Sequence, residues 1–356
     1  MADSTQRPPH RPPHRWRRAV RAVATAAALG LVAWIVVRFL LPEFENENAS
    51  VLAAFRQISP GLVVAALICE AGSLAAVSGV TGTLLEWKIP YRSTLRIDLA
   101  DLAANHALPG GGTTAAVVRF RLLTVSGVSP AQALSSSLLE AGVQNLVLFA
   151  LFFAGILLSL TTLAGDAEMY GLAIGTGLVL IAVFVVAIWL LVHRSDAVVH
   201  LTARVGAHFA PAVEQGLTGL ARTLTSQTVS LLGDRRRTFA ALGYAAVNWA
   251  LDAAALWLML VAFGATIRPG PLLAAYGLAA IIALLPLTPG GLGLVEGVTV
   301  PALVAFGVAA PSALLGVLGW RVLEYWLPMP VGALCYLSLR VAWRRASPPS
   351  PGRPSR

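Results

Sequence analysis

The chain has 356 residues, of which 57% are hydrophobic and only 12% are charged, and its formal net charge is +9. Soluble domains carry about 25% charged residues, so this composition excludes a soluble enzyme, a disordered chain and a nucleic-acid-binding module. It indicates an all-α polytopic membrane protein, in which the basic excess sets the topology.

Both ends of the chain are basic and proline-rich, so we predict disordered tails over residues 1–18 and 341–356 that flank one membrane domain, 19–340. An apolar run of about 20 residues can cross the hydrocarbon core of a bilayer. Six crossings are predicted on this ground: Ala19–Leu41, Gly61–Leu85, Ala131–Leu163, Gly171–Val192, Phe239–Phe263 and Ser312–Leu339.

Two further apolar segments, Leu95–Val118 and Pro271–Phe306, are interrupted by prolines and glycines that break a helix. Lipid cannot hydrogen-bond the freed backbone groups, so such breaks must be buried in protein or line a wet cavity. We therefore predict two re-entrant helical hairpins. Their expected turn residues are Pro109, Gly110, Gly111 and Gly112 in the first hairpin, and Pro289, Gly290, Gly291 and Gly293 in the second.

The segment 193–237 is too polar to cross a membrane, although its apolar residues follow helical spacing. It is predicted to be a cytoplasmic amphipathic hairpin near the lipid headgroups. An ordinary connecting loop is the alternative.

The distribution of basic residues predicts the orientation. If the N-terminus lies inside, the inner segments hold 22 of the 26 Lys and Arg residues and the outer loops hold 3, while Arg321 falls within a crossing. Such a bias is typical of cytoplasmic loops. We therefore expect both termini to lie on the cytoplasmic side of the cell membrane.

The chain also contains an internal repeat. A shift of 180 residues places Pro109-Gly110-Gly111 on Pro289-Gly290-Gly291, the segment 61–85 on 241–265, and 131–160 on 311–340. In the predicted topology, repeat one (19–163) and repeat two (171–340) have opposite orientations. The expected fold is an inverted repeat of three crossings each, with two re-entrant hairpins, as in many transporters.

Three motifs resemble those of the lysylphosphatidylglycerol synthase transmembrane, or flippase-like (UPF0104), family. The sequence PGGLGLVEG at 289–297 is similar to its PGGLG-x-x-E signature, and Arg321-x-x-Glu324-Tyr325 is similar to its last-helix motif. Leu108-Pro-Gly, followed by Arg119 and Ser126-Gly-Val, resembles its first-half motif, but this chain lacks the glutamate that many members have near Thr113-Thr114.

The resemblance covers roughly residues 20–340 and has implications for function. The multifunctional synthases also carry a soluble aminoacyltransferase domain, which is not expected in this chain. The resemblance therefore implies lipid translocation or an accessory membrane role, and not lysyl transfer.

Ionisable side chains within membrane spans cost at least about 2.5–3.5 kcal/mol each on insertion scales and are usually functional. The candidates for substrate binding are Arg321, Glu324, Glu140, Arg119, Glu296 and Tyr325. The candidates for proton coupling or pairing are Glu70, Asp252, Asp101 and His106.

Each candidate has a structural alternative. Glu70 and Asp252 can serve as polar contacts between helices, and His106 as a satisfied interior histidine. Arg119 can be an arginine that extends to the interface. Arg321 can be part of an ion pair with Glu324 or Glu140.

The predicted function is translocation of a phospholipid or a lipid-linked anionic headgroup. Arg321 would anchor the phosphate, because a guanidinium is planar and always charged, with Glu324 and Glu140 as its counter-charges. The carboxylates would hold a cationic headgroup, pair with Arg321 or carry protons.

The expected partners are membrane lipids: an anionic or aminoacylated phospholipid, or a polyprenyl phosphate. A homodimer is left open. No metal, cofactor or nucleic-acid partner is predicted, and an enzyme is not favoured. The alternatives are a membrane enzyme or accessory subunit acting on a lipid carrier, against which no nucleophile elbow or phosphate-binding motif is found, and a secondary transporter of a small solute or ion.

Overall fold

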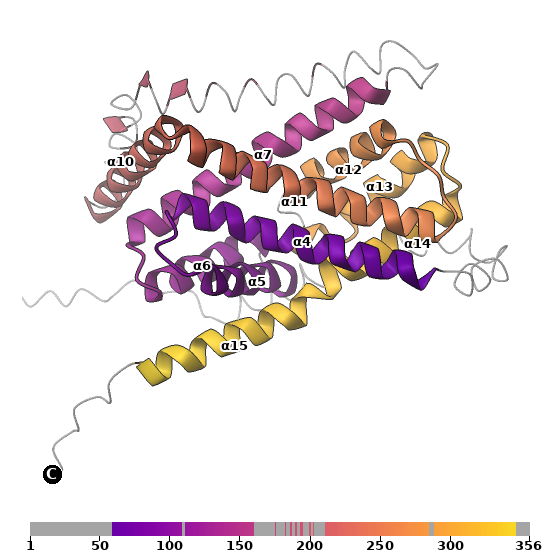
Figure 1. The fold of residues 1–356 in the computed structure, drawn as a ribbon. Helices are drawn as coiled ribbons and strands as arrows, with labels where there is room; N and C mark the ends of the chain where they lie inside the picture. The colour runs from indigo at the N-terminus through magenta and orange to yellow at the C-terminus, as the bar shows by residue number, and fades with distance from the viewer. Residues whose placement is uncertain are drawn as a thin grey trace, which may run out of the picture. The chain divides into compact units, whose positions relative to one another are not determined.

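The computed structural model describes residues 59–108, 111–159, 211–284 and 288–346, with a few isolated positions between 175 and 202. Two predicted crossings, Ala19–Leu41 and most of Gly171–Val192, lie outside the described residues, as does the predicted tail 1–18. All elements in the described part of the chain are helices (Figure 1).

Four helical segments are long and apolar enough to cross a membrane, so the chain is a multi-pass membrane protein. They are α4 (Pro60–Leu84), α7 (Pro130–Ser159), α11 (Arg235–Ala262) and the run Ala310–Trp343, and they match four of the six predicted crossings. The last run comprises α14 (Ala310–Arg321), the π-helical turn η3 (Val322–Trp326) and α15 (Pro328–Ala346). Since α15 continues to Ala346, the prediction of a disordered tail from residue 341 is wrong at its start.

The two interrupted segments each form a pair of short helices that pack against each other. The first pair is α5 (Tyr91–Ala107) with α6 (Gly111–Val125). The second is α12 (Pro269–Ala283) with α13 (Leu294–Ala305), joined in part by the 3-10 turn η2 (Pro289–Gly291). A 15-residue helix extends over only about 23 Å, which is less than the hydrocarbon core of about 30 Å.

The breaks fall where glycines were predicted to make them. Gly290, Gly291 and Gly293 have φ angles of 55°, 70° and 82°, a region that other residues adopt at a cost. Gly111 begins α6 with φ 46°, whereas Gly112 lies within the helix and not in the turn. Pro109 and Gly110 lie outside the described residues.

Helices from the two halves of the chain lie against each other. The helix α4 runs beside α11 (Figure 1), α5 packs against α15, and α7 packs against α12. Glycines permit the closest approaches: a Cβ at Gly155 would lie 2.5 Å from the backbone nitrogen of Ala274, and one at Gly332 would lie 2.0 Å from the carbonyl oxygen of Leu99. Small residues serve this purpose between membrane helices in general.

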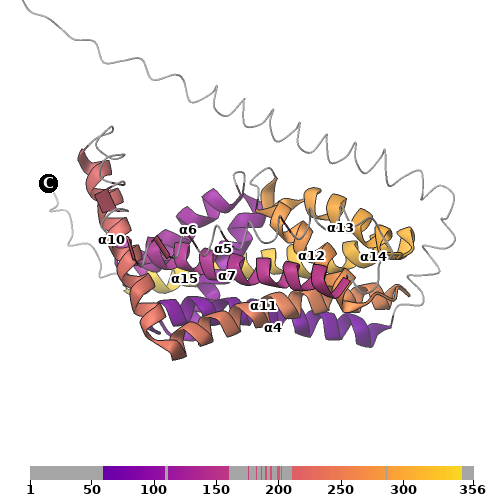
Figure 2. The same ribbon diagram turned by 90° about the horizontal axis from the view of Figure 1, so that it is seen from above.

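The polar segment contains one further helix, α10 (Pro211–Gly233), which packs against α7 and α11 (Figure 2). The Ser135 hydroxyl donates to the Gln227 side chain over 2.7 Å and ties α10 to α7. Residues 211–233 therefore form a helix and not a loop, while most of 193–210 lies outside the described residues.

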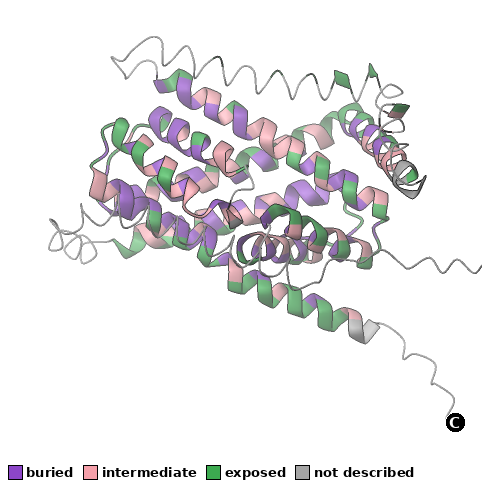
Figure 3. Ribbon diagram, turned by 180° about the vertical axis from the view of Figure 1, so that it is seen from behind, coloured by how far each residue is buried: buried purple, intermediate pink, exposed green. Residues whose placement is uncertain are grey.

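The described bundle exposes many large apolar side chains on its outside and buries several charged side chains among its apolar core residues. The side chains of Ile68 and Leu334 are each 67% exposed, whereas Arg119, Glu140 and Arg321 are buried. Figure 3 shows how exposed and buried residues are distributed over the helices. An apolar surface suits lipid, and charges that face the bundle interior are usually functional. The candidate site is therefore sought among the buried polar groups.

Candidate functional site

Arg321, at the end of α14, lies at the centre of the first buried polar cluster and is only 3% exposed. Its Nε donates to Glu296 over 2.7 Å and one terminal nitrogen donates to Glu324 over 2.6 Å. Its other terminal nitrogen donates to the Gly290 carbonyl over 3.1 Å. The guanidinium thus holds together the second glycine turn, α13 and η3.

The two carboxylates that hold Arg321 are fixed to different degrees. Oε2 of Glu296 also accepts the backbone N–H of Gly293 over 2.7 Å, which caps the first turn of α13. Glu324 stands on η3, where the chain forms a wide π-helical turn, and its side chain is 21% exposed. Such turns occur frequently at functional sites, and the Glu324 side chain is somewhat more exposed than that of Glu296, which is 16% exposed.

Tyr325 and His106 connect this cluster to the first interrupted segment. The Tyr325 hydroxyl donates to the His106 carbonyl over 2.9 Å, and the two rings stack with their centroids 4.2 Å apart. His106 Nδ1 lies 3.1 Å from the Tyr325 carbonyl, which can only accept, so Nδ1 carries the proton. The Arg321 guanidinium lies 4.6 Å from the centre of the Tyr325 ring.

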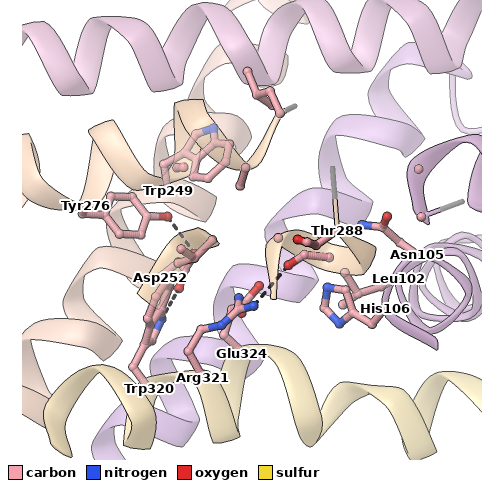
Figure 4. A pocket seen from close by; sticks show the side chains of 18 residues that line it. Leu102, Asn105, His106, Trp249, Asp252, Tyr276, Thr288, Trp320, Arg321 and Glu324 are labelled. Atoms are coloured by element: carbon pink, nitrogen blue, oxygen red, sulfur yellow. Dashed lines mark hydrogen bonds and ion pairs between the residues drawn. The ribbon is translucent and has the colours of Figure 1, made fainter. Parts of the chain in front are cut away.

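A pocket of about 440 Å³ opens beside Arg321 (Figure 4). Its walls come from both interrupted segments and from α11, α14 and η3, and they include Asn105, Thr288 and Gly291. The Thr288 hydroxyl is buried and has no hydrogen-bond partner within the described residues. An unpaired buried hydroxyl is costly, so a ligand that accepts or donates a hydrogen bond would stabilise this pocket.

Asp252 lies on the wall of the same pocket and accepts two hydrogen bonds. The Tyr276 hydroxyl donates to one carboxylate oxygen over 2.7 Å and the Trp320 indole donates to the other over 2.6 Å (Figure 4). The carboxyl of Glu70, which is 3% exposed, approaches Asp252 from α4. These two candidates for proton coupling or pairing therefore lie together between α4 and α11, a pairing that the sequence did not predict.

Arg119, in α6, lies at the centre of a second buried cluster and is 6% exposed. It pairs with Glu140 on α7, with Asp98 over 2.9 Å and with Asp101 over 3.4 Å, and it donates to the Thr81 hydroxyl over 2.9 Å. The alternative in which Arg119 extends to the interface is wrong, because three carboxylates hold the guanidinium inside the bundle.

The partner predicted for Arg321 is partly wrong. Glu324 does bind it, but Glu140 binds Arg119, and Glu296 takes the remaining place beside Arg321. The predicted residues thus divide between two sites. Arg321, Glu324, Glu296, Tyr325 and His106 form one, and Arg119, Glu140 and Asp101 form the other.

Several site residues were not among the sequence candidates. Asp98 stands one helical turn before Asp101 on α5, a spacing that places both on one face. Thr81, Thr288, Tyr276 and Trp320 gave no comparable signal, because hydroxyl and aromatic residues are common in apolar spans.

The second cluster adjoins a pocket of about 320 Å³. Leu102, Asn105 and Gly112 line both pockets. Each arginine cluster therefore borders its own cavity, and the two cavities share lining residues in the first interrupted segment.

Carboxyl groups outnumber arginines in both clusters. Around Arg321 lie Glu296 and Glu324, with the Glu70–Asp252 pair nearby, and around Arg119 lie Asp98, Asp101 and Glu140. No set of three His, Cys, Asp or Glu side chains suited to a metal ion occurs in the described parts of the chain. The excess negative charge calls for protons or for a cationic group on a ligand.

Comparison with known proteins places these residues in a family. Residues 21–332 match the family described as Lysylphosphatidylglycerol synthase TM region. The chain is also similar to a UPF0104 membrane protein of Methanothermobacter thermautotrophicus, with 30% identity over 116 residues. That similarity covers 33% of this chain and 31% of the relative, so it spans about a third of each protein.

Proposed function

The chain belongs to the Lysylphosphatidylglycerol synthase TM region family, and from the site it carries we propose that it translocates a phospholipid, or another lipid-linked anionic headgroup, across the cell membrane. The observation that carries this proposal is the pocket of about 440 Å³ that places the buried Arg321 beside the unpaired Thr288 hydroxyl. Both groups suit a phosphate, which accepts several hydrogen bonds at once.

We further propose that the two halves form an inverted repeat with re-entrant hairpins and with both termini in the cytoplasm. Support comes from the order of the elements, since each of α4, α5, α6 and α7 has a counterpart close to 180 residues later. Gly127 and Gly307, at the matched ends of α6 and α13, have φ angles of 94° and 88°. The contacts of α5 with α15 and of α7 with α12 are equivalent under this repeat.

The geometry favours an exchange mechanism at Arg321. A headgroup phosphate would take the place of Glu324 on the guanidinium, while Glu296 remains held by Gly293. The phosphate would then accept a pair of charge-assisted hydrogen bonds. The released Glu324 would be free to hold a positive group of the same headgroup.

The excess of carboxyl groups favours some lipids over others. A headgroup with only negative charge would add to the charge imbalance around both arginines, whereas a headgroup with a phosphate and an ammonium group would offset it. Among the candidate lipids, an aminoacylated phospholipid therefore fits better than a polyprenyl phosphate.

The test is a headgroup-accessibility assay in proteoliposomes. Labelled phosphatidylglycerol, lysyl-phosphatidylglycerol and a polyprenyl phosphate would each be placed in one leaflet, and their appearance in the other would be followed. We expect transfer with the wild type and its loss with Arg321→Ala. The exposed Arg268, at the start of α12, provides the control variant Arg268→Ala. Transfer of a soluble solute without transfer of any lipid would favour the solute transporter instead.

A further inference from the structure

Glu70 and Asp252 lie beside each other where two long apolar helices pack together. Glu70 stands on α4 and Asp252 on α11. Glu70 is 3% exposed, and its Oε2 is buried and receives no hydrogen bond from the described residues. A carboxylate in that position would have one oxygen unsatisfied, which is costly in a dry interior.

The hydrogen bonds around the pair decide where a proton must lie. Asp252 accepts from the Tyr276 hydroxyl and from the Trp320 indole, and the indole N–H can only donate. Two donors stabilise Asp252 as a carboxylate. Glu70 receives no such donor at its buried Oε2, so the hydrogen of this pair of neighbouring carboxyl groups belongs on Glu70.

No cation in the described parts of the chain is placed to neutralise the pair. Arg321 directs its donors to Glu296, Glu324 and the Gly290 carbonyl, and Arg119 directs its donors to the other cluster. Two adjacent buried charges of the same sign repel each other strongly. We therefore propose that Glu70 and Asp252 form a proton-binding site that holds one proton in this state, and that this proton couples to the movement of the headgroup.

The coupling part rests on the proposed function, and the structure supplies a route for it. Asp252 lines the pocket beside Arg321, whereas Glu70 lies behind it and does not line the pocket. The Glu70 O–H bond would break as the proton forms an O–H bond with the Asp252 carboxylate, and that bond would break in turn as a water in the pocket takes the proton and leaves as hydronium. The reverse steps would return the proton to Glu70. No other reactant is needed.

Within the described residues, the groups that face the pair come from five elements. Besides Glu70 with its neighbour Cys69 on α4 and Asp252 on α11, they are Tyr276 on α12, Trp320 on α14 and Glu324 on η3. Glu324 is the charged member of the set, and in this state its charge is balanced by an ion pair with Arg321, whose Nη1 lies 2.6 Å from the Glu324 Oε2. A phosphate that displaces Glu324 would expose its charge to the pair, so headgroup binding and proton binding would strengthen each other.

Infrared spectroscopy of the purified full chain tests the proton site without any transport assay. At neutral pH we expect a C=O stretching band of a protonated carboxyl that Glu70→Gln removes. The exposed Glu86, paired with Arg237 on the surface, provides the control Glu86→Gln, which should leave the band in place. A Glu70→Gln spectrum that retains the whole band would overturn the proposal.

A second variant covers the case in which Glu70→Gln does not fold. Tyr276→Phe removes one donor from Asp252 and leaves the ring in place. Because Glu70 would then be bonded to a stronger acceptor, the band should shift in frequency. An unshifted band in folded Tyr276→Phe would place the proton elsewhere and contradict the proposal.

Lipid transfer under an imposed pH gradient tests the coupling. Wild-type proteoliposomes should transfer the labelled lipid faster with the gradient in one direction than in the other, and Glu70→Gln should lose this difference. A difference that persists in Glu70→Gln would refute coupling through this site. An infrared band without transfer of any lipid would show that the proton site stands and that the proposed function fails.

Discussion

Tyr325 and His106, which are 219 residues apart in the chain, exchange two hydrogen bonds: the Tyr325 hydroxyl donates to the His106 carbonyl over 2.9 Å, and His106 Nδ1 donates to the Tyr325 carbonyl over 3.1 Å. This reciprocal contact joins the end of α5 to η3. It therefore fixes the first interrupted segment against the turn that carries Glu324, and changes here should affect both pockets.

Replacing Tyr325 by Phe should show how much the hydrogen bond, as distinct from the ring contact, contributes to stability. The stacked ring stays, and the His106 carbonyl loses its donor, so we expect a loss of about 1 kcal/mol in stability. Tyr325→Ala also removes the stacking and should cost more. Thermal unfolding in detergent measures both, with the more exposed Tyr336→Phe as the control. Equal losses for Phe and Ala at position 325 would assign the whole effect to the hydroxyl.

Gly290 should tolerate no side chain. Its φ of 55° is unfavourable for other residues, and a Cβ would lie 2.4 Å from the Tyr325 ring and 2.7 Å from the His106 ring. We expect Gly290→Ala to lower the unfolding temperature and to abolish lipid transfer. Gly297, where a Cβ would meet nothing within 4 Å, supplies the control Gly297→Ala. Normal transfer by Gly290→Ala would show that the turn can move away from Tyr325.

Arg119 should be required for folding. Its removal would leave Asp98, Asp101 and Glu140 buried without their common cation, and breaking a buried pair in this way costs about 3–5 kcal/mol. We expect Arg119→Ala to yield little monodisperse protein in size-exclusion chromatography. The exposed Arg121, two residues along α6, gives the control Arg121→Ala. Similar yields for the two variants would contradict a structural role for the cluster.

The interrupted segments were predictable because their cause is local. Proline and consecutive glycines break a helix in any context, and membrane lipid cannot satisfy the freed backbone groups. Gly290, Gly291 and Gly293 accordingly form the break in the second segment. The position of Arg321 well inside an apolar run can likewise be read from the local sequence, and Arg321 is buried as expected.

Ion-pair partners were not predictable because they depend on distances between separate helices. Glu140 was predicted to pair with Arg321 because the repeat places its segment, 131–160, on the segment 311–340 that holds Arg321. In the folded chain α6 packs against α7, which brings Arg119 to Glu140. The Thr288 hydroxyl was also missed. What marks it is the lack of a hydrogen-bond partner within the described residues, and this too depends on how the separate helices pack.

The orientation of α11 tests the proposed topology. Arg236 lies in the first turn of this helix and Arg268 lies beyond its other end, at the start of α12, and the proposal places Arg236 in the cytoplasm and Arg268 outside. In a chain with Cys69 and Cys335 replaced by Ser, an impermeant thiol reagent added to intact cells should label Arg268→Cys and not Arg236→Cys. Opening the cells should make position 236 reactive. The opposite pattern would reverse the topology and place both termini outside.

The last prediction concerns the Arg321 guanidinium, which we expect to serve as the phosphate anchor. Arg321→Lys keeps the charge, but a lysine ammonium cannot donate hydrogen bonds to Glu296, Glu324 and the Gly290 carbonyl in the geometry of the planar guanidinium. We therefore expect it to insert and fold with lipid transfer reduced at least about tenfold, a loss of about 1.4 kcal/mol in binding the moving headgroup. Arg321→Ala should abolish transfer.

Exchange of Arg321 and Glu324 would not be a clean test of this role, because the swap would place a glutamate at position 321 against Glu296. The sharper comparison is Arg321→Lys against Glu324→Gln, since both disturb the same ion pair. If Arg321 only maintains the structure, the two variants should lose stability and transfer together. If it anchors the phosphate, Glu324→Gln should bind labelled phosphatidylglycerol, which has no positive group for Glu324 to hold, at least as tightly as the wild type, because the competing carboxylate is gone. Arg321→Lys should bind this lipid more weakly. Weaker binding of phosphatidylglycerol by both variants would eliminate the anchor role.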